Sequence, residues 1–182
     1  MTRSLKTVML ANVMKNIIRK VIGIKKIQEL KISLSKIFYL SLGENCLTDD
    51  ILKRHNIKSF STPYASARSN IDYIIQLETM DYRFLLNNDY LEYGTAGKDK
   101  VIRSKLITNC MNIYANWHMK GLEFSHHDII AKEEEKDKIR RRIKRMRKYR
   151  GKKTMIFFYH YRFNTNMNLE MLFKKMEILL NI

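Results

Sequence analysis

The sequence predicts one α/β domain, in which a mainly parallel sheet is flanked by helices, preceded by a helical extension at the N-terminus. Two observations lead to this fold class. Short apolar runs alternate with segments of helical periodicity, which is the pattern of strands joined through helices. The length of 182 residues suits one domain, and 45% hydrophobic residues suffice for one packed core. We therefore place the extension at residues 1–36 and the domain at residues 37–182.

The net charge of +17 comes from two segments of the chain. Residues 1–36 carry nine Lys or Arg and one acid, and residues 133–153 carry twelve bases and four acids. Residues 37–132 carry eleven of each, so the middle of the chain is neutral. The pI of about 9.9 therefore reflects two basic segments and does not by itself predict nucleic-acid binding.

Residues 1–36 have the pattern of a basic amphipathic helix. Apolar residues such as Val13, Ile17 and Val21 recur at helical spacing among lysines and arginines. Such a helix either packs on its own domain or contacts an anionic membrane or a partner. We see neither a signal-peptide pattern nor a window of about 18 uncharged residues. We expect a cytoplasmic protein, with residues 1–36 as the part that can reach the inner membrane face.

The domain begins with the apolar run KIFYLSLG, a predicted strand that ends at Gly43. The run NCLTDDILKRHN then predicts a helix, with Asn45 or Thr48 as its N-cap and Asn56 as its left-handed stop. Cys46 therefore lies where the chain turns from strand to helix. At such a turn the helix dipole favours a thiolate, and backbone N–H groups can hold an oxyanion.

In the middle of the chain, Asn70 is expected to cap a helix that is interrupted after about residue 79. Residues 94–100 are predicted to be a polar turn. A weakly helical or irregular region that includes Cys110 follows, and it leads to a short strand in GLEFSHHD.

Residues 133–150 predict a highly charged helix, with glutamates at its start and bases toward its end, as the helix dipole favours. Its apolar positions form one narrow stripe, which consists of Ile139, Ile143, Met146 and Tyr149. The simplest interpretation of the bases is a solvent-exposed face. The alternative is a nucleic-acid contact, although the segment lacks aromatic residues for base stacking apart from Tyr149. The strand TMIFFYHYR and the helix NLEMLFKKMEILL complete the domain.

A second polar cluster, Ser125-His126-His127-Asp128, ends the predicted strand in GLEFSHHD. A thiol nucleophile needs a base that takes its proton, and the base needs a group that orients it. The ends of parallel strands meet at one edge of a sheet, so Cys46 and this cluster can meet. Because neighbouring residues on a strand face opposite ways, we expect only one of His126 and His127 to point at Cys46.

These motifs resemble a bacterial domain-of-unknown-function family described as "putative papain-like cysteine peptidases". The resemblance extends from about residue 38 to residue 162, and its most specific elements are Ser-Leu-Gly-x-x-Cys at 41–46 and Phe-x-His-His-Asp at 124–128. It implies a cysteine peptidase, or a related thiol-dependent hydrolase or acyltransferase, and it adds a papain-like α+β fold as an alternative. It also implies the site residues. These are Cys46 as the nucleophile, His127 and Asp128 as the base and its partner, and His126 as the neighbouring candidate.

The chain departs from this family after its first helix. Many relatives carry Pro-Phe-Asp-Trp there, whereas residues 63–66 are Pro-Tyr-Ala-Ser, so an Asp that could orient the base is missing. Relatives are often associated with surface polysaccharide genes. The resemblance therefore implies a peptide or an acyl- or glycan-linked substrate.

Several other predictions concern the same region. Polar residues at the ends of the strands and in the loop after Pro63 are candidate substrate contacts; they are Ser41, Asn45, Arg68, Asn70 and His160. Ser41 is alternatively an esterase-type nucleophile. The histidines together with Asp128 make a poor chelate, so we expect no metal and no cofactor. A non-catalytic basic α/β module that binds nucleic acid, an anionic membrane or a protein is the alternative function.

Overall fold

The chain divides into two units, Met1–Lys36 and Ile37–Ile182. The computed structural model describes residues 24–106, 122–161 and 168–182. In the first unit it shows α2 (Ile24–Leu34), and the rest of the predicted N-terminal helix lies outside the described residues. In the part of the chain that the structure describes, no helix is both long and apolar enough to cross a membrane.

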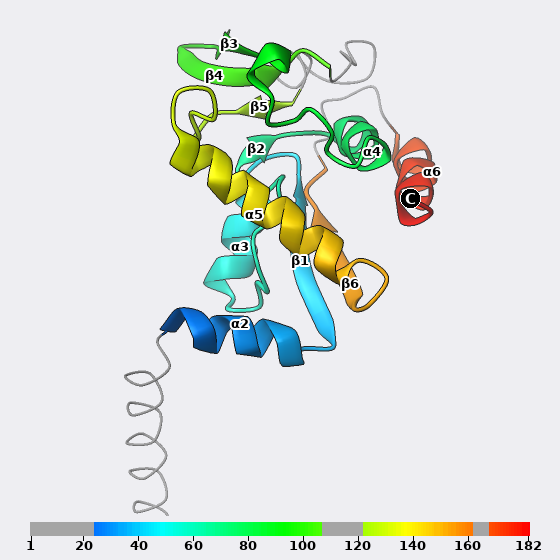
Figure 1. The fold of residues 1–182 in the computed structure, drawn as a ribbon. Coiled ribbons are helices and arrows are strands. Elements are labelled where there is room, and N and C mark those ends of the chain that lie inside the picture. Colours follow the sequence, from blue (N-terminus) through cyan, green and yellow to red (C-terminus); the bar gives the residue numbers. More distant parts are fainter. Residues whose placement is uncertain (1–23, 107–121, 162–167) are drawn as a thin grey trace, which may run out of the picture. The chain divides into compact units, whose positions relative to one another are not determined.

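The second unit is built on a parallel pair of strands, β1 (Ile37–Gly43) and β6 (Thr154–Tyr159) (Figure 1). Both come from the apolar runs that predicted them. Phe38 and Leu40 lie on one face of β1 and are fully buried, as the alternation of side chains along a strand requires. At the end of the pair, Gly43 is in register with Tyr159.

The second sheet is antiparallel, with the order β2-β5-β4-β3. Its strands are β2 (Ala67–Arg68), β3 (Leu91–Ala96), β4 (Asp99–Ser104) and β5 (Glu123–Phe124). The mixed α/β class is confirmed, and among the described strands the parallel pairing is that of β1 with β6. The polar turn predicted at residues 94–100 is shorter than expected, because residues 94–96 and 99–100 belong to a β3–β4 hairpin, and only Gly97 (φ +66°) and Lys98 form its tight turn.

Four α-helices and one 3-10 helix accompany the two sheets in the described part of this unit. They are α3 (Leu47–Arg54), α4 (Ile71–Thr79), η1 (Asn88–Tyr90), α5 (Glu133–Tyr149) and α6 (Leu169–Leu180). Asn70 caps α4 as predicted, because its Oδ1 accepts a hydrogen bond from the amide of Tyr73 at 2.9 Å. Asn56 follows α3 in the predicted left-handed conformation, with φ +57°.

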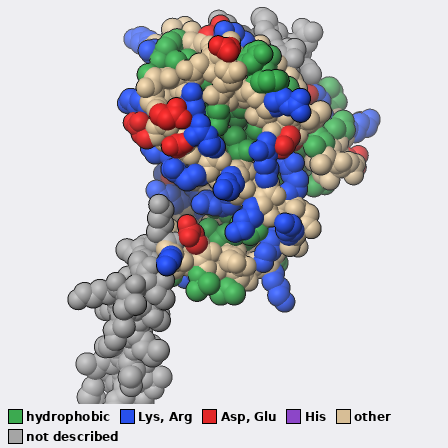
Figure 2. All heavy atoms as spheres, viewed as in Figure 1, with side chains coloured by type: hydrophobic (Ala, Val, Ile, Leu, Met, Phe, Trp, Pro, Cys, Tyr) green, Lys and Arg blue, Asp and Glu red, His purple; other side chains and the backbone are tan. Residues whose placement is uncertain are grey.

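The long helix α5 covers the domain with its narrow apolar stripe. The four residues predicted for this stripe are all buried. The ring of Tyr149 packs edge-on against Phe38 of β1, with the ring centres 5.0 Å apart. The opposite side of α5 is exposed, and Lys and Arg side chains gather there around an apolar hollow (Figure 2).

A buried carboxylate fastens the end of α5 to α4. Glu78 accepts a hydrogen bond from the hydroxyl of Tyr64 at 2.6 Å, and it also binds the Tyr82 hydroxyl and the Arg150 guanidinium. Burial, reinforced by the neighbouring carboxylate, raises the pKa of both tyrosines well above the ordinary value of 10.0. Both hydroxyls therefore stay protonated and satisfy an acid that would be costly to bury alone.

β1 ends at a close contact that only glycine permits. Gly43 has φ +114°, and a Cβ atom there would lie 2.5 Å from the side-chain oxygen of Ser69. The amide of Ser69 donates a hydrogen bond to the carbonyl oxygen of Glu44 at 3.0 Å. The hydroxyl of Ser69 donates a second one to the carbonyl oxygen of Leu42 at 3.4 Å. These contacts join the β1–α3 turn to the segment that follows β2.

We predict that Gly43→Ala destabilises the domain more than Gly97→Ala does. Gly97 also has a positive φ but has no atom within 4 Å of an added Cβ, so its substitution isolates the backbone cost of about 1–2 kcal/mol. Gly43→Ala adds the clash with Ser69 and a less favourable backbone angle, because its φ of +114° lies outside the left-handed region that alanine can adopt, and the two effects should together cost roughly a further 1 kcal/mol or more. Urea unfolding of the two variants measures the difference. Equal losses of stability would show that neither the Ser69 contact nor the backbone angle of Gly43 adds a cost.

Candidate active site

Cys46 occupies the N-cap position of α3, immediately after the turn that ends β1. Its side chain is exposed, and it is the free cysteine of the described residues; Cys110 lies outside them. Asn45 and Thr48, which the sequence offered as N-caps, lie on either side of this position and make other hydrogen bonds. Asn45 Oδ1 accepts a hydrogen bond from the amide of Leu47 at 2.9 Å. The hydroxyl of Thr48 donates a hydrogen bond to the carbonyl oxygen of Gly43 at 3.2 Å. The thiol therefore lies at the N-terminal end of α3, which is the positive end of the helix dipole.

Two acids in the first turn of α3 could oppose a thiolate. Each is paired with a base, Asp49 with Lys58 at 2.5 Å and Asp50 with Arg54 at 2.6 Å. The Asp49 pair is largely buried, with side-chain exposures of 16% and 18%, so solvent screens it little. The negative charge beside the thiol is thus balanced.

Cys46 opens into a cavity of about 190 Å³ whose walls come from three segments. These segments are the β1–α3 turn, β2 with the residue before it, and the turn after β5. The lining residues are Asn45, Cys46, Ser66, Ala67, Arg68, Ser125 and His126. The pairing of β2 with β5, in which Ala67 is in register with Phe124, brings the last two segments together. Cys46 and His126 thus share one cavity although they are far apart in the sequence.

Arg68 contributes a charged group to this cavity. Its guanidinium lies 3.3 Å from Asp99 and 3.7 Å from Glu123, and its side chain is 17% exposed. Glu123 is almost fully buried. Its Oε1 accepts hydrogen bonds from Nη2 of Arg103 at 2.6 Å and from Nε of Arg103 at 3.0 Å. Asp99 and Glu123 are thus two of the groups that neutralise the charge of Arg68 beside the cavity.

His127 and Asp128 are not among the residues that line this cavity. His127 Nδ1 forms a hydrogen bond with Glu135 of α5, and the side chain is only 12% exposed. Asp128 accepts hydrogen bonds from the amide of Ala131 at 2.9 Å and from the hydroxyl of Tyr93 at 3.2 Å. The pKa of Asp128 is lowered below its usual 3.8, and the hydrogen bond from the amide of Ala131 is the largest cause. His126, His127 and Asp128 meet at a neighbouring cavity of about 250 Å³.

Three other candidate residues lie in the interior or at the end of β6. Ser41 and Asn70 are fully buried, the first within β1 and the second as the cap of α4, so neither reaches the surface of the thiol cavity. His160 is partly buried, and its amide donates to the carbonyl oxygen of Gly43 at 3.0 Å. Asn45 and Arg68 are thus the predicted substrate contacts that line the cavity.

Sequence reasoning missed two residues of α5 that act near the site. Glu135, rather than Asp128, holds His127. Arg142 lies on the same side of the helix, is half-buried, and donates Nη1 to Ser66 Oγ at 3.1 Å. The spacing of seven residues between Glu135 and Arg142 places them on one face, but nine bases between Lys138 and Arg150 made Arg142 indistinguishable from its neighbours.

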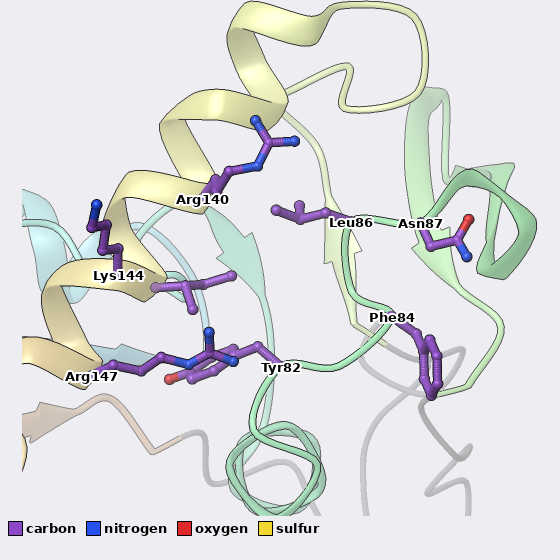
Figure 3. A pocket seen from close by; sticks show the side chains of 8 residues that line it. Tyr82, Phe84, Leu86, Asn87, Arg140, Lys144 and Arg147 are labelled. Carbon is purple, nitrogen blue, oxygen red and sulfur yellow. The ribbon is translucent and has the colours of Figure 1, made fainter.

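Among the described residues, no group of three or more His, Cys, Asp and Glu side chains is arranged to hold a metal ion. Another cavity, of about 470 Å³, lies on the other side of α5. Arg140, Lys144 and Arg147 project from α5 along one wall, while Tyr82 and Leu86 reach in from the segment after α4 (Figure 3). None of the residues predicted for the site lines it.

We predict that His127 makes the domain less stable as the pH falls. Burial lowers the pKa of His127 below its ordinary 6.5, although the hydrogen bond with Glu135 opposes this. The unfolded chain therefore binds a proton at a higher pH than the folded chain, and stability is lost as the pH falls through about 6.5. Urea unfolding between pH 7.5 and 5.5 should show a steeper decline for the wild type than for His127→Asn. An equal or shallower decline in the wild type would contradict the buried, neutral state of this imidazole.

A family model matches residues 37–181, and its family is described as "Putative papain-like cysteine peptidase (DUF1796)". No curated protein and no solved structure matches the chain. The matched residues cover the whole second unit apart from its last residue, and they include Cys46 and the segment Ser125–Asp128. The chain therefore belongs to the family of this description, as its motifs indicated.

Proposed function

We propose that the chain is a thiol-dependent hydrolase or acyltransferase in which Cys46 is the nucleophile and His126 is the base. One observation carries the proposal, namely that these two side chains line the same cavity. Membership of a cysteine peptidase family and the position of Cys46 at a helix start support it. His127, which the motif favours as the base, is held by Glu135 instead, so we assign it a positioning role for the turn that carries His126.

The reaction follows from these positions. His126 accepts the thiol proton, and Sγ of Cys46 attacks the carbonyl carbon of an acyl substrate to form a tetrahedral intermediate. The intermediate collapses to an acyl-thioester as the leaving amine or hydroxyl takes the proton from His126. Water then attacks the thioester and restores the thiol, which completes hydrolysis. A hydroxyl group, such as one on a surface polysaccharide, would complete acyl transfer instead.

The oxyanion of the intermediate needs donors beside Cys46. Asn45 precedes Cys46 and lines the cavity, and its Oδ1 is engaged by the amide of Leu47. This hydrogen bond orients the side chain and leaves Nδ2 as the amide group that can donate to an oxyanion. We therefore assign Asn45 to oxyanion stabilisation.

We predict that His126 controls the reactivity of Cys46. Alkylation by iodoacetamide, followed by mass spectrometry of the Cys46 peptide between pH 5 and 9, reports the thiolate fraction at each pH. His126→Ala should move the midpoint of this profile to higher pH, because an imidazolium neighbour stabilises the thiolate. His127→Ala, in a protein shown to be folded, should move it much less. A larger shift from His127→Ala would transfer the role of base to that residue, and no shift from either would end the proposal.

A second candidate function, nucleic-acid binding by α5, is favoured by the cavity of about 470 Å³ on the other side of this helix. From Lys138 to Arg150 the helix carries nine bases and no acid. Arg140, Lys144 and Arg147 lie on its wall of the cavity, and Asp81 holds the guanidinium of Arg147 at 2.8 Å. The fold also supplies the aromatic groups that α5 itself lacks, because Tyr82 and Phe84 line the same cavity.

We predict that this second function, if present, is separable from the thiol site. Each phosphate contact with a single strand adds about 0.7 to the slope of log affinity against log salt, so the triple variant Arg140→Gln/Lys144→Gln/Arg147→Gln should lower the slope by about 2. Fluorescence anisotropy of a labelled oligonucleotide measures the slope. The rate at which Cys46 is alkylated should not change. An unchanged salt slope would exclude this wall of α5 as a phosphate-binding surface.

A further inference from the structure

We propose that Arg142 of α5 is a positioning residue for the thiol site, because its guanidinium acts on all three segments that form the walls of the cavity at Cys46. This inference rests on the proposed roles of Cys46 and His126. It adds that the placement of these two side chains relative to each other depends on a residue that does not itself line the cavity.

Arg142 contacts the wall of the cavity that lies just before β2. Its Nη1 donates a hydrogen bond to Ser66 Oγ at 3.1 Å, and Ser66 lines the cavity. The next two residues form β2, in which Arg68 is in register with Glu123 of β5. The strand β5 leads directly to the turn that carries His126. The hydrogen bond to Ser66 therefore affects two of the three walls.

Arg142 also acts on the helix that begins at Cys46. Burial lowers the pKa of Arg142, and the carboxylate of Asp49 is the strongest of the charges that oppose this effect. Asp49 lies in the first turn of α3, three residues after Cys46. Its Oδ2 is held by Lys58, whereas its buried Oδ1 accepts no hydrogen bond within the described part of the chain. The positive charge of Arg142 thus helps to stabilise a carboxylate that is costly to bury.

The third segment is the turn after β5, which Arg142 influences through Glu135. This carboxylate forms a hydrogen bond with Nδ1 of His127, and it is the second charge that opposes the effect of burial on the pKa of Arg142. Arg142 is also among the groups that lower the pKa of His127, although burial is the largest cause. The guanidinium, the carboxylate and the imidazole therefore interact as one group beside His126.

Arginine suits this role because its guanidinium presents five N–H donors in a fixed plane. A lysine carries the same charge on one compact ammonium group, which cannot reproduce this planar arrangement. Arg142→Lys therefore keeps the charge and removes the geometry, so that effects of position are separated from effects of charge. Arg145 is the matched control on α5. It is half-buried, its guanidinium lies 5.3 Å from the ring centre of Phe60, and it does not line the cavity.

A cycle of single and double variants measures the coupling between Arg142 and the Cys–His pair. The measured quantity is the shift that His126→Ala causes in the midpoint of the pH profile for iodoacetamide alkylation of Cys46 in the full chain. In the wild-type background we expect a shift of about one pH unit to higher pH. In the Arg142→Lys background, with folding verified by circular dichroism, the shift should fall to less than half, because His126 is no longer held beside the thiol.

Two further variants make the result specific. Arg145→Lys should leave the full effect of His126→Ala, because this arginine contacts none of the three walls. Ser66→Ala removes only the hydroxyl that Arg142 contacts, and it should reduce the effect partially; it takes the place of Arg142→Lys if that variant does not fold. An undiminished shift in the folded variant, or an equal reduction in Arg145→Lys, would overturn the inference.

A purely structural role of Arg142 has a different signature from a positioning role. It would lower the free energy of unfolding in Arg142→Lys but leave the effect of His126→Ala as large as in the wild type, which would overturn the inference alone. If His126→Ala does not move the profile of the wild type at all, the proposed function and this inference fail together.

Discussion

Gly43 and Ser69 hold two segments of the chain in contact at the end of β1, and two of the three walls of the thiol cavity lie within three residues of that contact. On one side, Asn45 and Cys46 follow Gly43 into α3. On the other side, Ser66–Arg68 precede Ser69. Because Gly43 lacks a side chain, the two backbones approach closely enough for the amide of Ser69 to bond to Glu44. The segments that carry Cys46 and Arg68 are thus held together by the contact between Gly43, Glu44 and Ser69.

The parts of this structure that the sequence predicted are those that depend on local patterns. The apolar runs of β1 and β6, the cap at Asn70 and the buried stripe of α5 follow from hydrophobic periodicity and capping chemistry. The position of Cys46 at a turn from strand to helix follows from the same patterns. The hairpin of β3 and β4 was missed because apolar and polar residues alternate only weakly along its two strands. In addition, Gly94 within β3 is a residue typical of loops.

The arrangement of the histidines depends on contacts that no local pattern contains. β5 ends at Phe124, so the rule that neighbouring residues on a strand face opposite ways does not apply to His126 and His127. Instead, Glu135 draws His127 toward α5, and His126 is left at the cavity. The role of Arg142 is equally nonlocal, because it depends on which of many similar bases on α5 meets the loop at Ser66.

The small side chain of Ser66 sets two properties of the thiol cavity at once. Its size leaves space in the wall beside Cys46, and its hydroxyl is the acceptor for Arg142. A bulkier, apolar residue at this position would narrow the cavity and would also leave the half-buried guanidinium without its acceptor. A substitution of Ser66 would therefore change both the volume of the thiol cavity and the surroundings of the Arg142 charge.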